Sequence, residues 1–138
     1  SYFLMKRILV DMSATIIHHG HINLLKKASK FGKVIVALTT DKQIEKCKGY
    51  TPELNYKQRK EVLENIVYVS SVIPSKWLID QNFMKKHKID YLVHGNDCPN
   101  PIPRNKKIIF KRTKGISSND IRKKVIKNFI KKNKGLTI

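Results

Sequence analysis

The sequence contains few cysteines and no long hydrophobic run. Its two cysteines, Cys47 and Cys98, stand far apart, and no CxxC pair occurs. This content leaves room for at most one disulfide and argues against a structural zinc site, so we expect a reducing, cytoplasmic setting. No apolar stretch approaches the roughly 20 residues that a membrane span needs. No charged and apolar leader opens the sequence, so we expect a protein that is neither secreted nor membrane-spanning.

Acidic residues are scarce as well. Ten Asp and Glu stand against 29 Lys and Arg, which gives a formal net charge of +19. Such a charge suits a phosphate-rich small substrate, a nucleic acid or an anionic membrane surface. Only 5 of the 29 cations are Arg, the residue best suited to bidentate recognition of bases. The composition therefore favours phosphate handling over nucleic-acid binding.

The length and the hydrophobic content fit one compact domain over residues 1–138. Hydrophobic residues make up 41% of the 138 positions, which is enough to fill a core. Residues 1–5 are expected to be a cloning remnant or a mobile end. Residues 117–134 are expected to form a basic C-terminal helix.

Short β-branched runs alternate with segments of helical periodicity. This alternation predicts an α/β fold, a Rossmann-like three-layer sandwich with a five-stranded parallel sheet. We expect Pro74 to end the third strand. The predicted strands are Lys6–Met12, Lys33–Thr40, Val67–Ile73, Asp90–His94 and Lys107–Lys111. The predicted helices are His21–Phe31, Asp41–Lys48, Tyr56–Ile66, Ile79–His87 and Ser117–Asn133.

The loops that follow the strands are the expected location of the functional site. Ligands of open parallel sheets bind beyond the carboxyl ends of the strands, near the point where the strand order reverses. The loops in question are Ser13–His21, Thr39–Lys48, His94–Asp97 and Arg112–Ser118.

The first of these loops holds His18-His19-Gly20-His21, where a helix is expected to begin. Helix N-termini offer free N–H groups to phosphates, Gly20 lets a phosphate approach the backbone, and imidazoles donate hydrogen bonds. No Walker A motif and no GxGxxG occurs, so the commoner phosphate loops are absent. Packing or capping histidines are the structural alternative. No third ligand stands at a suitable spacing, so we expect no metal site here.

A second motif, Arg112-Thr113-Lys114-Gly115-Ile116-Ser117-Ser118, precedes the last predicted helix. Together with HxGH, it resembles the small HxGH nucleotidyltransferases, above all the glycerol-3-phosphate cytidylyltransferase-like family, whose second motif reads RTEGIS[ST]. The resemblance runs from about Lys6 to Lys124. The stretch from Met12 to His18 is also similar to the cytidylyltransferase-type domain fused to some phosphoenolpyruvate mutases, which points to phosphonate or phosphorylated amino-alcohol substrates.

The resemblance implies a reaction and its partners. CMP would pass from CTP to a phosphorylated alcohol or phosphonate, giving a CDP-linked product and pyrophosphate. Mg²⁺ would be carried mainly by the nucleotide phosphates. Small enzymes of this family are often homodimers, so a homodimer is expected, whereas a nucleic-acid partner is not.

The resemblance also implies roles for individual residues. Phosphate neutralisation and stabilisation of the pentacovalent phosphorus would fall to His18, His21, Lys46 and Arg112. The nucleotide-binding residues would be Met12, Ser13, Ala14, His18, Gly20, His21, Gly95, Asp97, Arg112, Thr113, Gly115, Ile116, Ser117 and Ser118. The acceptor would meet Lys48 and Arg59, and by their position near strand ends we add Asp11 and Trp77.

Several of these residues also have ordinary structural interpretations. Ser117 with Asp120 matches a helix capping box. Arg59 can pair with Glu61 or Glu64, which lie close to it in the sequence. Trp77 can serve in core or interface packing.

The sequence departs from the family pattern near the acceptor. Ala14-Thr15 replace an aromatic-acid pair, Asn96 replaces an Asp, Cys98 a Trp and Lys114 a Glu. These changes leave the triphosphate motifs intact and leave the acceptor open.

Two alternative functions remain open from the sequence. An adenylyltransferase is one, because ATP-dependent enzymes share HxGH. A nucleic-acid-binding module is the other, because the C-terminal segment is rich in lysine. The same segment carries an apolar stripe that we expect to pack on the sheet or on a partner subunit, with a membrane surface as a further option. The stripe consists of Ile121, Val125, Phe129 and Ile130.

Overall fold

A single sheet of five parallel strands organises the chain. The computed structural model describes residues 5–95 and 98–133, so residues 1–4, part of the expected mobile end, lie outside the described residues. The strand order is β3-β2-β1-β4-β5, which confirms the predicted α/β class. The order reverses between β1 and β4, so the switch point lies between them. The strands are β1 (Arg7–Met12), β2 (Lys33–Thr39), β3 (Ser71–Ser75), β4 (Tyr91–Gly95) and β5 (Lys107–Phe110).

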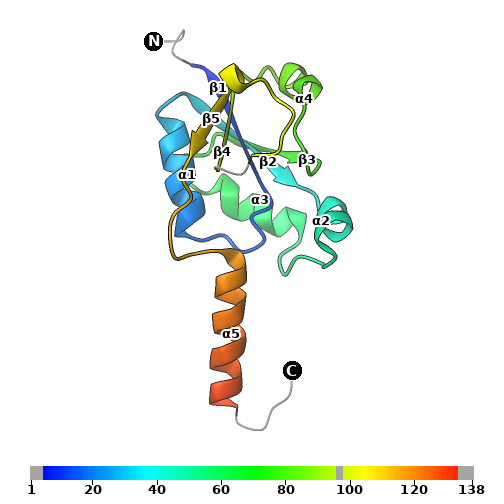
Figure 1. The fold of residues 1–138 in the computed structure, drawn as a ribbon, viewed down its shortest axis with the longest axis vertical. Coiled ribbons are helices and arrows are strands. Elements are labelled where there is room, and N and C mark those ends of the chain that lie inside the picture. Colours follow the sequence, from blue (N-terminus) through cyan, green and yellow to red (C-terminus); the bar gives the residue numbers. More distant parts are fainter. Residues whose placement is uncertain (1–4, 96–97, 134–138) are drawn as a thin grey trace.

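Helices pack against the sheet and bury it (Figure 1). Alternation along β1 divides the core, because Ile8 and Val10 face one side with Leu25, and Leu9 faces the other with Met84. Both faces are apolar, which explains why the central strands read as continuous hydrophobic runs. The helices are α1 (His19–Ser29), α2 (Asp41–Lys48), α3 (Tyr56–Glu64), α4 (Gln81–Lys86) and α5 (Ser118–Lys132), with a short 3₁₀ turn at Arg104–Lys106.

The third strand differs from its prediction. The predicted range Val67–Ile73 is wrong at both ends, because β3 covers Ser71–Ser75 and Val67 is 88% exposed. Pro74 lies within the strand, in register with Leu38, and does not end it. Because β3 is an edge strand, the missing N–H of a proline is tolerated there.

The last helix, α5, projects away from the sheet (Figure 1). The expectation that its apolar stripe packs on the sheet is wrong, since Val125 is 59% exposed and Phe129 46% exposed. In the described part of the chain, these apolar side chains of α5 are left accessible to a partner. No described helix is both long and apolar enough to cross a membrane.

Candidate functional site

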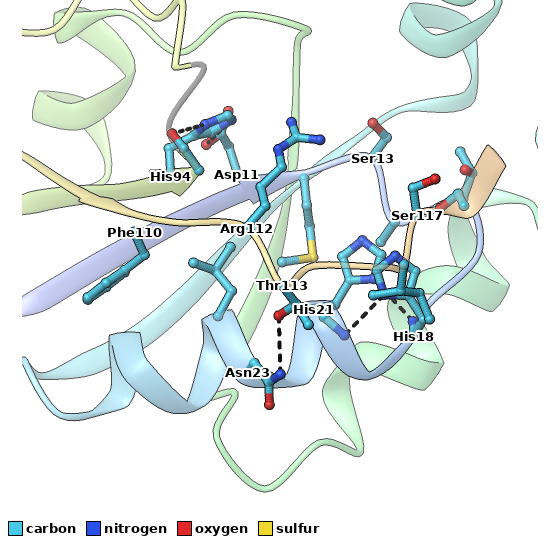
Figure 2. A pocket seen from close by; sticks show the side chains of 18 of the residues that line it. Asp11, Ser13, His18, His21, Asn23, His94, Phe110, Arg112, Thr113 and Ser117 are labelled. Carbon is cyan, nitrogen blue, oxygen red and sulfur yellow. Dashed lines mark hydrogen bonds and ion pairs between the residues drawn. The ribbon is translucent and has the colours of Figure 1, made fainter. Parts of the chain in front are cut away.

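A cavity of about 460 Å³ opens at the carboxyl ends of the strands. It receives residues from all four loops that the parallel-sheet topology singled out. Figure 2 shows two histidines at one end, and Asp11 with His94 at the other. The predicted nucleotide-binding residues found in its lining are Met12, Ser13, Ala14, His18, Gly20, His21, Gly95, Arg112, Thr113, Ile116, Ser117 and Ser118.

The two histidines are held by the start of α1. His18 is the N-cap residue, and its Nδ1 accepts a hydrogen bond from the Gly20 N–H at 3.0 Å. The Nδ1 of His21 accepts from the His18 N–H at 3.1 Å, and the ring centroids lie 4.1 Å apart. Because both Nδ1 atoms accept, the neutral rings carry their proton on Nε2. Each ring therefore has one N–H donor left for a ligand.

Both imidazoles are biased toward the neutral form. The pKa of His21 is lowered from 6.5 to about 4, first by burial and then by neighbouring His18, Arg112 and Lys48. The pKa of His18 is also lowered, by burial and by His19. At neutral pH the rings are hydrogen-bond donors, and the positive charge of the pocket comes from Lys and Arg.

Gly20 is required by the position of the His18 ring. A Cβ atom at Gly20 would lie 2.8 Å from His18 Cε1, closer than real contacts allow. A larger residue would push the imidazole out of its capping position. The glycine of the motif thus leaves room for the His18 ring in its capping position and also lets a phosphate approach the backbone.

The second motif is hydrogen-bonded to residues on either side of the first motif. Asn23 on α1 donates from Nδ2 to Thr113 Oγ1 at 3.2 Å, as drawn in Figure 2. The Ser118 hydroxyl donates to the Ile16 carbonyl at 3.1 Å. Ser117 caps α5 by accepting from the Asp120 N–H at 3.1 Å, which is one of the two bonds of the predicted capping box, and it also lines the pocket. These bonds fix the segment that carries Arg112 beside the start of α1.

Arg122, which the sequence placed in a basic tail, lies in the pocket wall. It donates to Glu53 at 2.7 and 3.1 Å and to Thr15 Oγ1 at 2.9 Å, and its guanidinium stands 5.0 Å from the Tyr50 ring centroid. The hydrogen bond from Arg122 lowers the pKa of Glu53. Since 69 positions separate the two residues, no sequence pattern indicated this pair.

Five other predicted site residues differ in where the structure places them. Lys46, predicted to neutralise phosphate, is exposed on α2 and is not among the residues lining the pocket. Lys48 does line it, with Nζ 5.5 Å from the ring centroid of Trp77, which also lines it. Gly115 stands outside the lining. Asp97 lies outside the described residues.

The structure corrects the predicted role of Arg59 in binding the acceptor. Its side chain is fully buried, and it donates to the carbonyls of Ser13, Thr39 and Leu54 at 2.7, 2.9 and 3.1 Å. It also donates to Asp41 Oδ1 at 2.6 Å. A guanidinium committed to these four partners holds loops together and does not face the pocket. The suggested pairing with nearby glutamates is likewise replaced by Asp41.

Asp11 lies at the end of β1, in the pocket lining, as expected. Its Oδ2 accepts from Asn100 Nδ2 at 3.1 Å, and its Oδ1 lies 3.5 Å from His94 Nε2. Neither Asn100 nor His94 was predicted as a site residue. Further lining residues that the sequence did not single out are Asn23, Leu24, Lys27, Phe110, Lys111 and Asn119. The topology could have indicated His94, because it sits at the end of the strand beside β1.

Comparison with known proteins gives a consistent result. A family model described as cytidylyltransferase-like matches residues 13–119. Glycerol-3-phosphate cytidylyltransferase of Staphylococcus aureus is 38% identical over 129 residues, covering 88% of this chain and 96% of that protein. Choline-phosphate cytidylyltransferase of Saccharomyces cerevisiae is 34% identical over 139 residues, covering 91% of this chain and 32% of that longer protein. The solved structure of a lipopolysaccharide core biosynthesis protein from Thermoplasma volcanium shares the fold, with TM-score 0.60, 19% identity, and coverage of 91% of this chain and 89% of that one.

Proposed function

The chain belongs to the cytidylyltransferase-like family, and from that premise we propose that it transfers CMP from CTP to a small phosphorylated alcohol or phosphonate. It is an enzyme of the nucleotidyltransferase type. The observation that carries the assignment is the pair of Nδ1-anchored imidazoles, His18 and His21, at the start of α1 inside the pocket. The products would be a CDP-linked compound, or its phosphonate counterpart, and pyrophosphate.

In the proposed reaction the substrate supplies its own nucleophile. A phosphate or phosphonate oxygen of the acceptor attacks the α-phosphorus of CTP and forms a new P–O bond. The bond from that phosphorus to the oxygen bridging to the β-phosphate breaks, and its electron pair leaves with pyrophosphate. No side chain has to form a covalent intermediate, so the protein acts by alignment and charge stabilisation.

The pocket residues divide this work by their chemistry. Nε2–H donors of His18 and His21, with the N-terminus of α1, would meet non-bridging oxygens as negative charge builds at the reacting phosphorus. Lys48 and Arg112 line the same pocket and would neutralise the β- and γ-phosphates. Neutral donors beside fixed cations favour the transition state without requiring a proton transfer.

Mg²⁺ is part of the proposal as a companion of the nucleotide. Asp11 is the only carboxylate among the described lining residues, and no group of three metal-ligating side chains occurs in the described chain. This donor set does not make a protein-held Mg²⁺ site, so the ion would be held mainly by phosphate oxygens. No step above depends on a protein–metal contact.

The exposed stripe of α5 supports a homodimer as part of the proposal. Of the stripe residues, Val125, Phe129 and Ile130 are 59%, 46% and 45% exposed, and their neighbour Ile126 is 49% exposed. Apolar side chains grouped on one helix face gain free energy when a second copy covers them. We place the enzyme in the cytoplasm, where nucleotides are available and where its two free cysteines, Cys47 and Cys98, stay reduced.

Ligand-dependent melting together with pyrophosphate release tests the proposed function. CTP with Mg²⁺ is expected to raise the melting temperature more than ATP with Mg²⁺ or duplex DNA, because a bound ligand stabilises the native state. Pyrophosphate release should then require both CTP and a phosphorylated acceptor. A larger effect of ATP would support the adenylyltransferase alternative. Stabilisation by DNA, with no effect of either nucleotide, would contradict an enzyme of this kind.

A further inference from the structure

Arg122 is the point at which three parts of the pocket wall meet. From the first half of α5 it donates to both carboxylate oxygens of Glu53, at 2.7 and 3.1 Å. It also donates from Nη2 to Thr15 Oγ1 at 2.9 Å and from Nη1 to Asn119 Oδ1 at 3.3 Å. A carboxylate bound through two parallel N–H groups fixes the geometry as well as the charge of the pair. Figure 1 shows the start of α5 beside the segment that joins α2 to α3, where Glu53 lies.

Each of the three segments carries a residue assigned above to the phosphates. Thr15 stands shortly before His18 in the loop after β1. Glu53 stands shortly after Lys48, the last residue of α2. Helix α5 follows directly on the motif that begins with Arg112. One guanidinium therefore connects the supports of the side chains that would surround the triphosphate.

The end of α2 depends most on this connection. The helix has 8 residues, and a helix of that length is not stable by itself in water. Its first residue, Asp41, is tied to the buried Arg59, and Ile44 is buried in its middle. Residues 49–55, all of which the structure describes, form neither helix nor strand. Glu53 is the residue through which Arg122 holds this segment, so the position of Lys48 should depend on the ion pair.

Neither stability nor phosphate binding explains the pair well. The Glu53 side chain is 50% exposed, and ion pairs with an exposed partner contribute little to the free energy of unfolding. All three guanidinium nitrogens of Arg122 already donate to protein acceptors, so a phosphate would have to displace them. Lys48 lines the pocket with an ammonium group that is exposed to solvent. The position of Lys48 is therefore the property that the pair can control.

We propose that Arg122 is a positioning residue, which through Glu53 and Thr15 holds Lys48 at the phosphate side of the pocket and does not itself bind the nucleotide. This inference rests on the proposed function and adds to it a residue that acts on the triphosphate through another. Lys48 would meet the phosphates both before and during the reaction. Loss of its position should therefore weaken CTP binding more than it slows the chemical step.

CTP affinity in two single variants tests the inference. Arg122→Gln and Glu53→Gln should each raise the Kd of CTP with Mg²⁺ by about 10-fold, measured by calorimetry, because a charge that is no longer held in place binds less tightly. Both should also speed hydrogen exchange in residues 45–54, because the local opening of this segment becomes easier. Urea unfolding should change little, since the pair is partly exposed.

A double-mutant cycle with Lys48→Gln separates positioning from direct binding. Lys48→Gln alone should also raise the Kd of CTP. Adding Arg122→Gln to it should change the Kd by less than about twofold, because the side chain that Arg122 positions is already gone. Lys123→Gln is the matched control, since Lys123 is exposed on the same helix and is not among the lining residues. It should leave both the Kd and the hydrogen exchange unchanged.

Opposite effects of the two single variants, with Arg122→Gln raising and Glu53→Gln lowering the Kd, would refute the inference and assign Arg122 to the phosphates directly. Additive losses in the cycle with Lys48→Gln would refute it in the same way. Unchanged CTP affinity or unchanged hydrogen exchange in both single variants would refute it and leave the proposed function standing. Absence of CTP binding by the wild type would refute the proposed function and the inference together.

Discussion

The histidine pair shows how backbone contacts can set side-chain chemistry. Each Nδ1 is used by an N–H at the start of α1, so each neutral ring presents its proton from Nε2. Burial lowers the pKa of both rings, which keeps them neutral near pH 7. A neutral donor that is already oriented needs no reorganisation when negative charge develops on a phosphate.

Replacing His18 by asparagine separates capping from catalysis. Asn is a favourable N-cap residue, so His18→Asn should keep α1 intact while removing the Nε2–H donor. We expect kcat to fall about 10²- to 10³-fold, with a much smaller change in CTP affinity, because the donor acts on the transition state. His19→Ala is the matched control, since His19 is exposed and is not among the lining residues. Unchanged turnover with weakened CTP binding in His18→Asn would contradict the proposed role.

The lowered pKa of His21 predicts a dependence of stability on pH. The ring titrates at about 4 in the folded state and at 6.5 ordinarily, so folding favours the neutral form. This contribution is fully present above pH 6.5 and is lost as the pH falls toward 4. It amounts to about 3 kcal/mol at most. Urea unfolding at several pH values should show a steeper loss over this window in the wild type than in His21→Asn, whose Oδ1 can replace Nδ1 as an acceptor. Parallel curves would contradict the shift.

At the scale of elements, one buried side chain connects two of the strand ends that contribute residues to the pocket. Arg59 on α3 donates to the carbonyls of Ser13 and Thr39, which follow β1 and end β2. It also bonds to Asp41, the first residue of α2. The ends of β1 and β2 and the start of the helix that carries Lys48 are thus tied to α3.

Removing Arg59 should therefore destabilise the protein. Arg59→Ala leaves a buried carbonyl set and a carboxylate without their donor, and we expect a loss of about 3–5 kcal/mol in the free energy of unfolding. Lys57→Ala on the same helix is the control, because Lys57 is exposed, and it should change stability by no more than about 0.5 kcal/mol. Urea titration measures both. A variant of Arg59 with near-normal stability and a selective rise in acceptor KM would restore the substrate role that the sequence suggested.

At the scale of the whole molecule, the exposed stripe of α5 is the surface that the proposed dimer would cover. Arg122 anchors the first part of this helix to Glu53, and the rest projects from the body with its apolar stripe exposed (Figure 1). The helix also carries much of the basic surface, including Lys123, Lys124 and Lys127. Lysines flanking an apolar stripe limit non-specific association and leave the stripe as the contact surface for a second copy.

Phe129→Glu tests the proposed dimer. A charge in the middle of the stripe should shift sedimentation from a dimer to a monomer, because it cannot be buried against a second apolar face. Lys127→Glu is the matched control on the same helix, where the residue is exposed and lies outside the stripe. A wild-type monomer at micromolar concentration, or a dimer unaffected by Phe129→Glu, would contradict the proposal.

Local sequence patterns determined the fold class, most element positions and the two phosphate motifs. The periodicity of apolar residues indicates which face of an element is buried, so the central strands and α1 were predictable. The HxGH motif is recognised from its residue types and their spacing alone. Only the tertiary structure decided that Arg59 is buried, that Arg122 meets Glu53 and that His94 faces Asp11. These contacts join positions 18, 69 and 83 residues apart in the chain, and local patterns carry no information about which distant side chains meet. Pro74 shows the same limit, because its acceptability depends on β3 being an edge strand, which the order of the sheet alone decides.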